Sequence, residues 1–167
     1  MNKRRLYRTW TWLRHIKPWY FLIIAIVSTM VCIHSLRANN EQMVVLRSAV
    51  YSADMNNTDV QGALGHLQAY VTSHMNTNLS TGDNPVYPPI QLKYTYDRLI
   101  QVQTKNLINS NNGLTFIPDS LFKFDFISPT WSPDLAGWSL LGAILAFIMF
   151  TLKLITDFWF KRQLKSN

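Results

Sequence analysis

Cysteine is almost absent from this chain of 167 residues. The single cysteine, Cys32, cannot form an intramolecular disulfide, so any folded domain must be held together by packing alone. Cys32 ends an apolar run, as the modified cysteine of a lipoprotein does, but Val31 precedes it where that signal needs a small residue. We therefore do not expect lipidation.

Motifs for catalysis and for phosphate binding are also missing. The six glycines form neither a Gly-rich phosphate loop nor a nucleophile elbow. No His-Glu-x-x-His pattern for zinc is present, and Glu41 is the only glutamate between residues 37 and 134. We predict a protein that is not an enzyme, with no catalytic residue, no metal site and no cofactor.

Charged side chains are scarce in two long stretches, residues 19–36 and 135–156. About 20 predominantly apolar residues are enough for a helix to cross a bilayer. We therefore predict two transmembrane helices at these positions, with a polar domain of residues 37–134 between them.

The basic side chains gather at the two ends of the chain, residues 1–18 and 157–167. Because basic flanks stay on the cytoplasmic side, we predict that both termini are cytoplasmic and that residues 37–134 lie outside the cell membrane. The intervening domain has more acidic than basic side chains, so nucleic acid is not an expected partner. Leu6, Trp10 and Leu13 have helical spacing, which fits either a helix on the inner membrane surface or a frayed basic tail.

A cleavable signal peptide is the alternative interpretation of the first span, but no Ala-x-Ala cleavage site follows it. The helical pattern also continues past the membrane edge, since Leu36, Met43 and Val50 recur at every seventh residue. We predict an uncleaved signal anchor whose helix runs on into the outer domain.

Two more helices are expected in the outer domain. Thr58 and Gln61 form a capping box at the start of the first, which places Val60, Leu64, Leu67, Val71 and Met75 on one side. The second is predicted at about residues 90–109, after Pro88 and Pro89, with Leu92, Tyr96, Leu99 and Gln103 on one face. The predicted fold is mainly α, a three-helix bundle with a short extended or β-like segment.

The extended segment is rich in phenylalanine. Phe122, Phe124 and Phe126 would share one face, because side chains two residues apart point the same way in an extended chain. This face could pack on the bundle, contact the outer leaflet or bind a partner. Together with Trp131, the three phenylalanines are the predicted interaction residues.

Two weaker patterns complete the candidate sites. His66, Tyr70 and His74 follow one another at four-residue steps, but the histidines are two turns apart and cannot chelate one metal unaided. In the second span, small residues spaced for close helix packing are Ser139, Gly142, Ala143 and Ala146. Lys153 precedes Asp157 by one turn, and we expect it to reach toward the headgroups with Asp157 beside it.

Four stretches carry a resemblance to a family: residues 36–40, 74–77, 87–92 and 123–138. The last reads Lys-Phe-Asp-Phe-Ile-Ser-Pro-Thr-Trp-Ser-Pro-Asp-Leu-Ala-Gly-Trp. In these stretches the chain resembles small two-span membrane proteins of Saccharibacteria and related candidate-phylum bacteria. The resemblance implies a bacterial cell membrane and no particular reaction.

Two functions fit these observations. The first is a non-catalytic, membrane-anchored helical module that docks a protein partner, or a second copy of itself, at the cell surface or in a membrane complex. The second is a sensor or solute-binding half-receptor that signals through another subunit.

Overall fold

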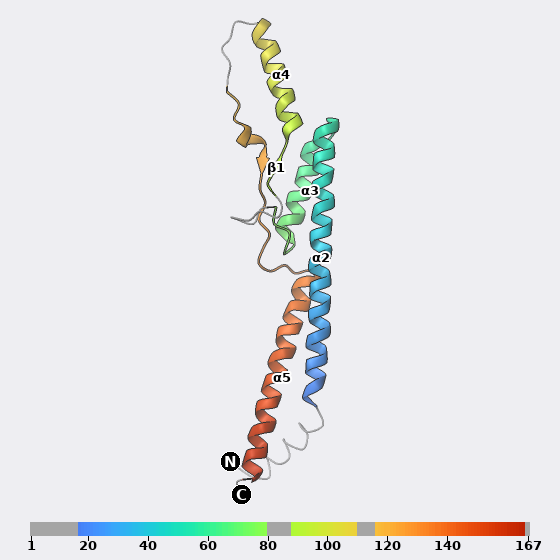
Figure 1. Ribbon diagram of the computed structural model, residues 1–167, viewed down its shortest axis with the longest axis vertical. Coiled ribbons are helices and arrows are strands. Elements are labelled where there is room, and N and C mark those ends of the chain that lie inside the picture. The colour runs from blue at the N-terminus through green and yellow to red at the C-terminus, as the bar shows by residue number, and fades with distance from the viewer. Residues whose placement is uncertain (1–16, 80–87, 110–115, 166–167) are drawn as a thin grey trace. The chain divides into compact units, whose positions relative to one another are not determined.

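The computed structural model describes residues 17–79, 88–109 and 116–165. The predicted amphipathic pattern of Leu6, Trp10 and Leu13 lies outside these residues. Figure 1 shows that the described chain is mainly helical, as predicted. Its helices are α2 (Pro18–Asn56), α3 (Val60–Ser73), α4 (Lys93–Asn109), α5 (Leu135–Lys165) and the short 3-10 helix η1 (Asp119–Phe122), and its strands are β1 (Ile90–Gln91) and β2 (Lys123–Phe124).

The chain divides into two compact units. The first, here called the apolar unit, comprises Met1–Ser35 and Asp134–Asn167, and the second, the polar unit, comprises Leu36–Pro133. Helix α2 contributes residues to both units without interruption. The apolar residues at every seventh position, Leu36, Met43 and Val50, had predicted this continuous helix.

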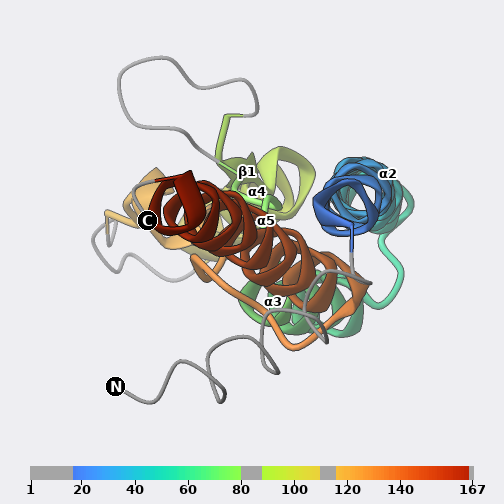
Figure 2. The ribbon, with the colours of Figure 1, turned by 90° about the horizontal axis from the view of Figure 1, so that it is seen from below.

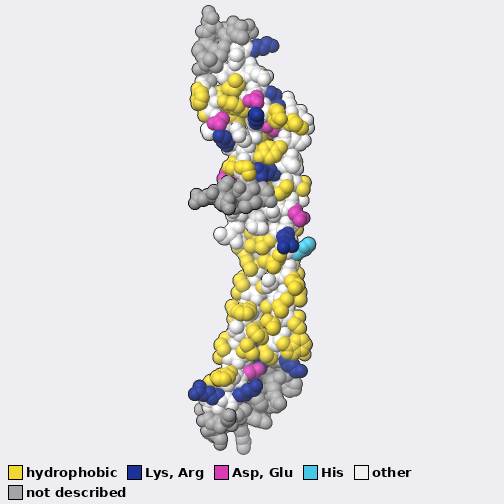
Figure 3. All heavy atoms as spheres, in the orientation of Figure 1, with side chains coloured by type: hydrophobic (Ala, Val, Ile, Leu, Met, Phe, Trp, Pro, Cys, Tyr) yellow, Lys and Arg dark blue, Asp and Glu magenta, His cyan; other side chains and the backbone are white. Residues whose placement is uncertain are grey.

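The apolar unit contains two helices that are long and apolar enough to cross a membrane, the first part of α2 and α5. Most of their large apolar side chains, including Ile24, Val27 and Ile144, lie exposed on the surface of the chain. The yellow side chains in Figure 3 cover these two helices. This pattern indicates association with a membrane.

Small residues line the buried side of the same two helices. Ala25 and Cys32 are buried on α2, and Ala136 and Ala146 are buried on α5. A Cβ atom added to Gly142 would lie 3.6 Å from Oγ of Ser28, so the two helices approach closely at this level. Of the predicted packing residues, Ala146 is buried, while the remaining ones are half-buried: Ser139, Gly142 and Ala143.

The polar unit has its own apolar core. It is formed by buried side chains from α2, from α3, from the segment after α3 and from the β1 region: Met43, Val50, Leu67, Val71, Leu79, Ile90 and Leu92. The predicted face of α3 is thus confirmed, since Leu67 and Val71 are fully buried. None of these buried core residues comes from α4.

The start of α3 differs from the prediction by one residue. Asp59, rather than Thr58, is the N-cap, and its Oδ1 accepts a hydrogen bond of 2.9 Å from the backbone N–H of Gly62. Thr58 instead belongs to the turn after α2, where its N–H donates to the carbonyl of Ala53. A Cβ atom at Gly62 would collide with the Asp59 carboxylate, so a larger residue there would displace the capping side chain.

The start of the third helix was also predicted wrongly. Ile90–Gln91 is not helical but pairs antiparallel with Lys123–Phe124, with Ile90 opposite Phe124. The N–H of Leu92 continues this ladder by donating to the carbonyl of Phe122 at 2.9 Å, and α4 begins only at Lys93. The reason is that a pairing with residues far along the chain competes with helix formation, which no local pattern reveals.

Helix α4 is also less buried than its sequence pattern suggested. Leu99, on the predicted core face, is 42% exposed. Figures 1 and 2 show that α3 and α4 do not run side by side. The mainly helical class with a two-stranded sheet is therefore observed, while the compact three-helix bundle stays a prediction.

Candidate functional site

One buried carboxylate joins the end of α2 to the start of α4. Asp54 is 1% exposed. Its Oδ2 accepts a hydrogen bond of 3.0 Å from the N–H of Tyr94, and its Oδ1 accepts bonds of 2.8 and 2.6 Å from the N–H and hydroxyl of Thr95. The first N–H groups of a helix have no partner within the helix. Asp54 therefore caps α4 from another helix, and its negative charge lies at the positive end of the α4 dipole.

Arg98 completes this junction. Its Nη1 donates to the backbone carbonyl of Asp54 at 2.9 Å, and its Nη2 donates to the Thr95 hydroxyl at 2.9 Å. Nη2 also lies 3.6 Å from Oδ1 of Asp54. Both oxygens of the buried Asp54 carboxylate thus accept hydrogen bonds from α4, which fits a structural role.

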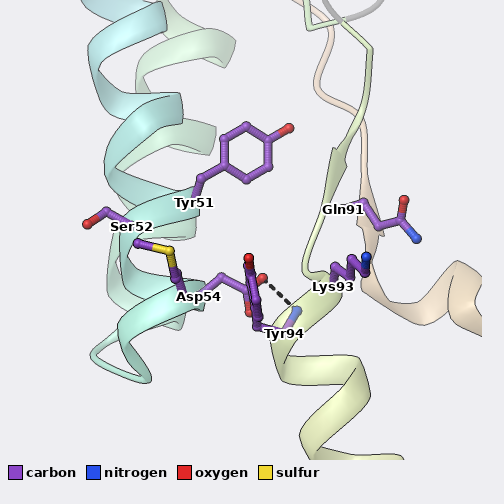
Figure 4. Close-up of a pocket in the computed structure, with 7 residues that line it drawn as sticks. Tyr51, Ser52, Asp54, Gln91, Lys93 and Tyr94 are labelled. Carbon is purple, nitrogen blue, oxygen red and sulfur yellow. Dashed lines mark hydrogen bonds between the residues drawn. The ribbon is translucent and has the colours of Figure 1, made fainter.

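A pocket of about 530 Å³ lies directly beside this junction. It is lined by residues of α2, β1 and the first turn of α4: Tyr51, Ser52, Asp54, Met55, Gln91, Lys93 and Tyr94. In Figure 4 the ring of Tyr51 extends from α2 toward the side that carries Gln91 and Lys93. The pocket is thus mainly aromatic and apolar, with an amide and an ammonium group on one wall.

Arg47, one turn before Tyr51 on α2, holds the tyrosine in place. Its guanidinium carbon lies 5.5 Å from the centre of the Tyr51 ring, and Nη2 donates to the Tyr51 hydroxyl at 3.2 Å. The same Nη2 donates to the carbonyl of Pro88 at 2.9 Å. A cation over the face of an aromatic ring is attracted by the ring's electron density, so Arg47 both orients Tyr51 and adds positive charge nearby.

The predicted phenylalanine face lies against the core. Phe122, Phe124 and Phe126 are half-buried and pack on the core cluster of the polar unit, and Phe122 makes an edge contact of 5.4 Å with Tyr96. Of the three expected uses of this face, core packing is the one that the contacts show. Trp131, the fourth predicted interaction residue, is exposed.

The opposite face of the same segment is exposed. Leu121 is 64% exposed and Ile127 is 78% exposed, and Phe116, shortly before them, is 86% exposed. Between Leu121 and Ile127, Lys123 and Asp125 also face solvent. Alternation therefore separates an inward aromatic face from an outward mixed face, which the sequence pattern had not distinguished as a site.

The predicted histidine edge of α3 is only partly brought together. The rings of Tyr70 and His74 stack with centres 4.1 Å apart, and Nδ1 of His74 lies 3.0 Å from the carbonyl oxygen of Tyr70. His66 is exposed on the same helix. Among the described residues no group of three or more His, Cys, Asp or Glu side chains is placed to hold a metal ion.

In the apolar unit, Lys153 forms an ion pair with Asp157, one helical turn further along α5. Lys153 is only 6% exposed, although lysine is rarely buried unless it is paired. The predicted contact between Lys153 and Asp157 is therefore observed.

The sequence analysis missed the pocket at Tyr51, because residues from three elements form it and no local motif marks it.

Comparison with protein-family models, with curated proteins and with solved structures finds no match for this chain. The resemblance to two-span proteins of Saccharibacteria and related bacteria consequently stays a prediction.

Proposed function

We propose that the protein is a non-catalytic module of a bacterial cell membrane, anchored by α2 and α5, whose polar unit docks a protein partner outside the cell. Support for the anchor comes from the two long apolar helices and from the basic residues at both ends of the chain. With both termini cytoplasmic, the polar unit faces outward.

The observation that carries the docking proposal is the outward face of the segment from Phe116 to Ile127. Its side chains Phe116, Leu121 and Ile127 rank among the most exposed large apolar side chains in the described chain. Large apolar side chains exposed along one segment favour an interaction site.

The backbone of this segment adds a second feature. The carbonyls of Phe122 and Phe126 accept hydrogen bonds from Leu92 and Leu79, so the even-numbered residues direct their backbone groups inward. Because these directions alternate along an extended chain, the N–H and C=O of Asp125 point toward the other edge. No described residue pairs with them. The partner that fits is an extended segment that adds a strand to this edge, with apolar side chains placed to meet Leu121 and Ile127.

Site-specific photo-crosslinking in native membranes tests this proposal. A photoreactive residue at position 127 is expected to capture a protein partner, whereas the same residue at position 124, which faces the core, should not. Asp125→Pro removes the N–H at the free edge and should abolish capture, while Asp125→Ala keeps the N–H and should retain it. Links between copies would identify the partner as a second copy of the chain. Capture of lipid alone at position 127 would refute the docking proposal.

The second candidate, a sensor or solute-binding half-receptor, is favoured by one specific observation. The pocket wall formed by Tyr51 and Met55 belongs to α2, the same uninterrupted helix that supplies an apolar span. A solute bound there would contact a helix that crosses the membrane. A solute that binds the pocket without changing the exchange of α2 amides with solvent would count against signalling.

A further inference from the structure

We infer that the pocket between α2, β1 and α4 binds a small molecule made of an aromatic ring and a carboxylate. This site shares no lining residue with segment 116–127, although Gln91 lies opposite Lys123 in the strand pair. The inference therefore goes beyond the docking proposal and stands if docking fails. The following observations define the charge, the shape and the rigidity of the pocket.

Among the lining residues, the exposed charged group is the cation Lys93. Lys93 lies on the pocket wall, and among the described residues its ammonium group has no ion-pair partner, not even Asp97 one turn further along α4. The only carboxylate in the lining, Asp54, is 1% exposed and is committed to Tyr94 and Thr95. Among the described lining residues a ligand therefore meets an exposed cation and no exposed carboxylate, which favours a negatively charged group.

The remaining lining favours a flat apolar body. The side chains of Tyr51, Met55 and Tyr94 are all partly exposed to the pocket and contribute ring faces and a thioether. Sulfur and aromatic rings both make favourable contacts with an aromatic ligand. A volume of about 530 Å³ is in the range of small-molecule sites. Gln91 can donate or accept one further hydrogen bond next to Lys93.

Three contacts tie the elements that form the walls of the pocket to one another. Asp54 ties α4 to α2, Arg47 holds the ring of Tyr51, and the pairing of β1 with β2 positions Gln91. A ligand would therefore lose less free energy in ordering the protein than it would in a flexible loop. In Figure 4 the Tyr51 ring extends from α2 on one side, and Gln91 and Lys93 are carried by β1 and the start of α4 on the other.

The test uses the full-length protein in detergent micelles and three probes: phenylacetate, 3-phenylpropionate and indole-3-acetate. Ligand-observed NMR, with empty micelles as the blank, measures binding. Each probe is compared with its neutral amide, which keeps the shape and removes the charge. Since charge-assisted hydrogen bonds are the strong ones, we expect the acids to bind about tenfold or more tightly than the amides.

Matched variants locate the site. Lys93→Met keeps the apolar stem and should weaken binding of the acids about tenfold, whereas Lys105→Met removes the same charge elsewhere on α4 and should change nothing. Tyr94→Leu should weaken acids and amides alike. Far-UV circular dichroism checks that each variant is folded.

The source of the ligand chemistry is settled by one further pair of probes. A tetrapeptide ending in phenylalanine, as free acid and as amide, asks whether the carboxylate can belong to the end of a protein chain. Binding of the free-acid peptide in preference to the small acids would assign the pocket to a chain terminus. The inference is wrong if no acid binds at millimolar concentration, if acids and amides bind equally, or if Lys93→Met binds as the wild type does.

Discussion

Each unit of the protein contains a buried charged side chain, and the two are neutralised in different ways. In the polar unit, Asp54 receives hydrogen bonds from Tyr94 and Thr95, which lie 40 and 41 residues away in the sequence. In the apolar unit, Lys153 pairs with Asp157, only four residues away on the same helix. The first charge is satisfied by the tertiary fold and the second by its own helix.

This difference decides what each charge can do. An i,i+4 pair is available to any helix that contains it, so Lys153 and Asp157 neutralise each other wherever α5 is formed. Asp54 is neutralised only when α4 begins beside α2. Asp54 therefore reports whether the polar unit is assembled, and Lys153 does not report assembly of the apolar unit.

Removal of the Asp54 carboxylate is the strongest way to test this contrast. Asp54→Ala leaves the first N–H groups of α4 without their buried acceptor and removes the ion pair with Arg98. We expect a loss of about 3 kcal/mol in the free energy of unfolding of the polar unit. Hydrogen exchange of the Tyr94 and Thr95 amides should accelerate accordingly.

Asp97→Ala provides the matched control. Asp97 lies on the same helix but is exposed, so its removal should change stability by no more than a few tenths of a kcal/mol. Unchanged hydrogen exchange at Tyr94 and Thr95 in Asp54→Ala would show that the cap from Asp54 contributes little to the stability of α4.

In the apolar unit the expected effect is smaller and depends on which partner is removed. Asp157→Ala leaves the Lys153 ammonium unpaired and should cost about 1–2 kcal/mol, because Lys153 is close enough to the end of α5 to extend toward water. Lys153→Met/Asp157→Ala should recover most of this loss, since an apolar side chain is tolerated at a buried position. Unfolding in mixed micelles, followed by tryptophan fluorescence, measures both. Equal losses in the single and double variants would contradict the local-pair interpretation.

The exposed pair between Lys123 Nζ and Asp119 Oδ2, at 2.6 Å, extends the comparison to full solvent exposure. The hydrogen bond from Lys123 and its positive charge lower the pKa of Asp119 below its ordinary value of 3.8. A carboxyl whose pKa is lower in the folded chain stabilises the fold above its unfolded pKa, and this contribution is lost as the pH falls through the folded pKa.

We expect the smallest effect here, because solvent and salt screen an exposed pair. The stability difference between the wild type and Asp119→Asn should be present at neutral pH, fade between about pH 5 and pH 2 and shrink with added salt. Chemical denaturation over this pH range measures it. A difference that grows as the pH falls would show that the sign is wrong.

The sequence predicted the features that depend on local contacts and missed those that depend on contacts between distant residues. The apolar helices, the continuous α2 and the buried face of α3 depend on periodicity within a single segment, and all three are observed. Alternation also predicted that Phe122, Phe124 and Phe126 share one face. It could not predict what covers that face, so packing on the core was one of three open alternatives. The pair of Lys153 and Asp157 was visible as a local spacing.

The predictions failed where distant residues compete with local ones. Ile90 and Gln91 belong to a strand because Lys123 and Phe124 pair with them, and the cap of α4 comes from α2. Asp54 lies one helical turn after Val50, a residue of the repeating apolar face of α2, and this spacing was the sequence signal that it points inward. The pocket beside it needed the positions of α2, β1 and α4 together, which no single stretch contains.

The origin of the two helix caps also bears on the order in which the polar unit folds. The cap of α3 is Asp59, the residue immediately before the helix, so α3 can form from its own segment alone. The cap of α4 comes from Asp54 and requires the chain to close a loop of about 40 residues, which costs conformational entropy before any contact repays it. Helix α4 should accordingly be the last helix of the polar unit to become ordered as the newly made chain folds.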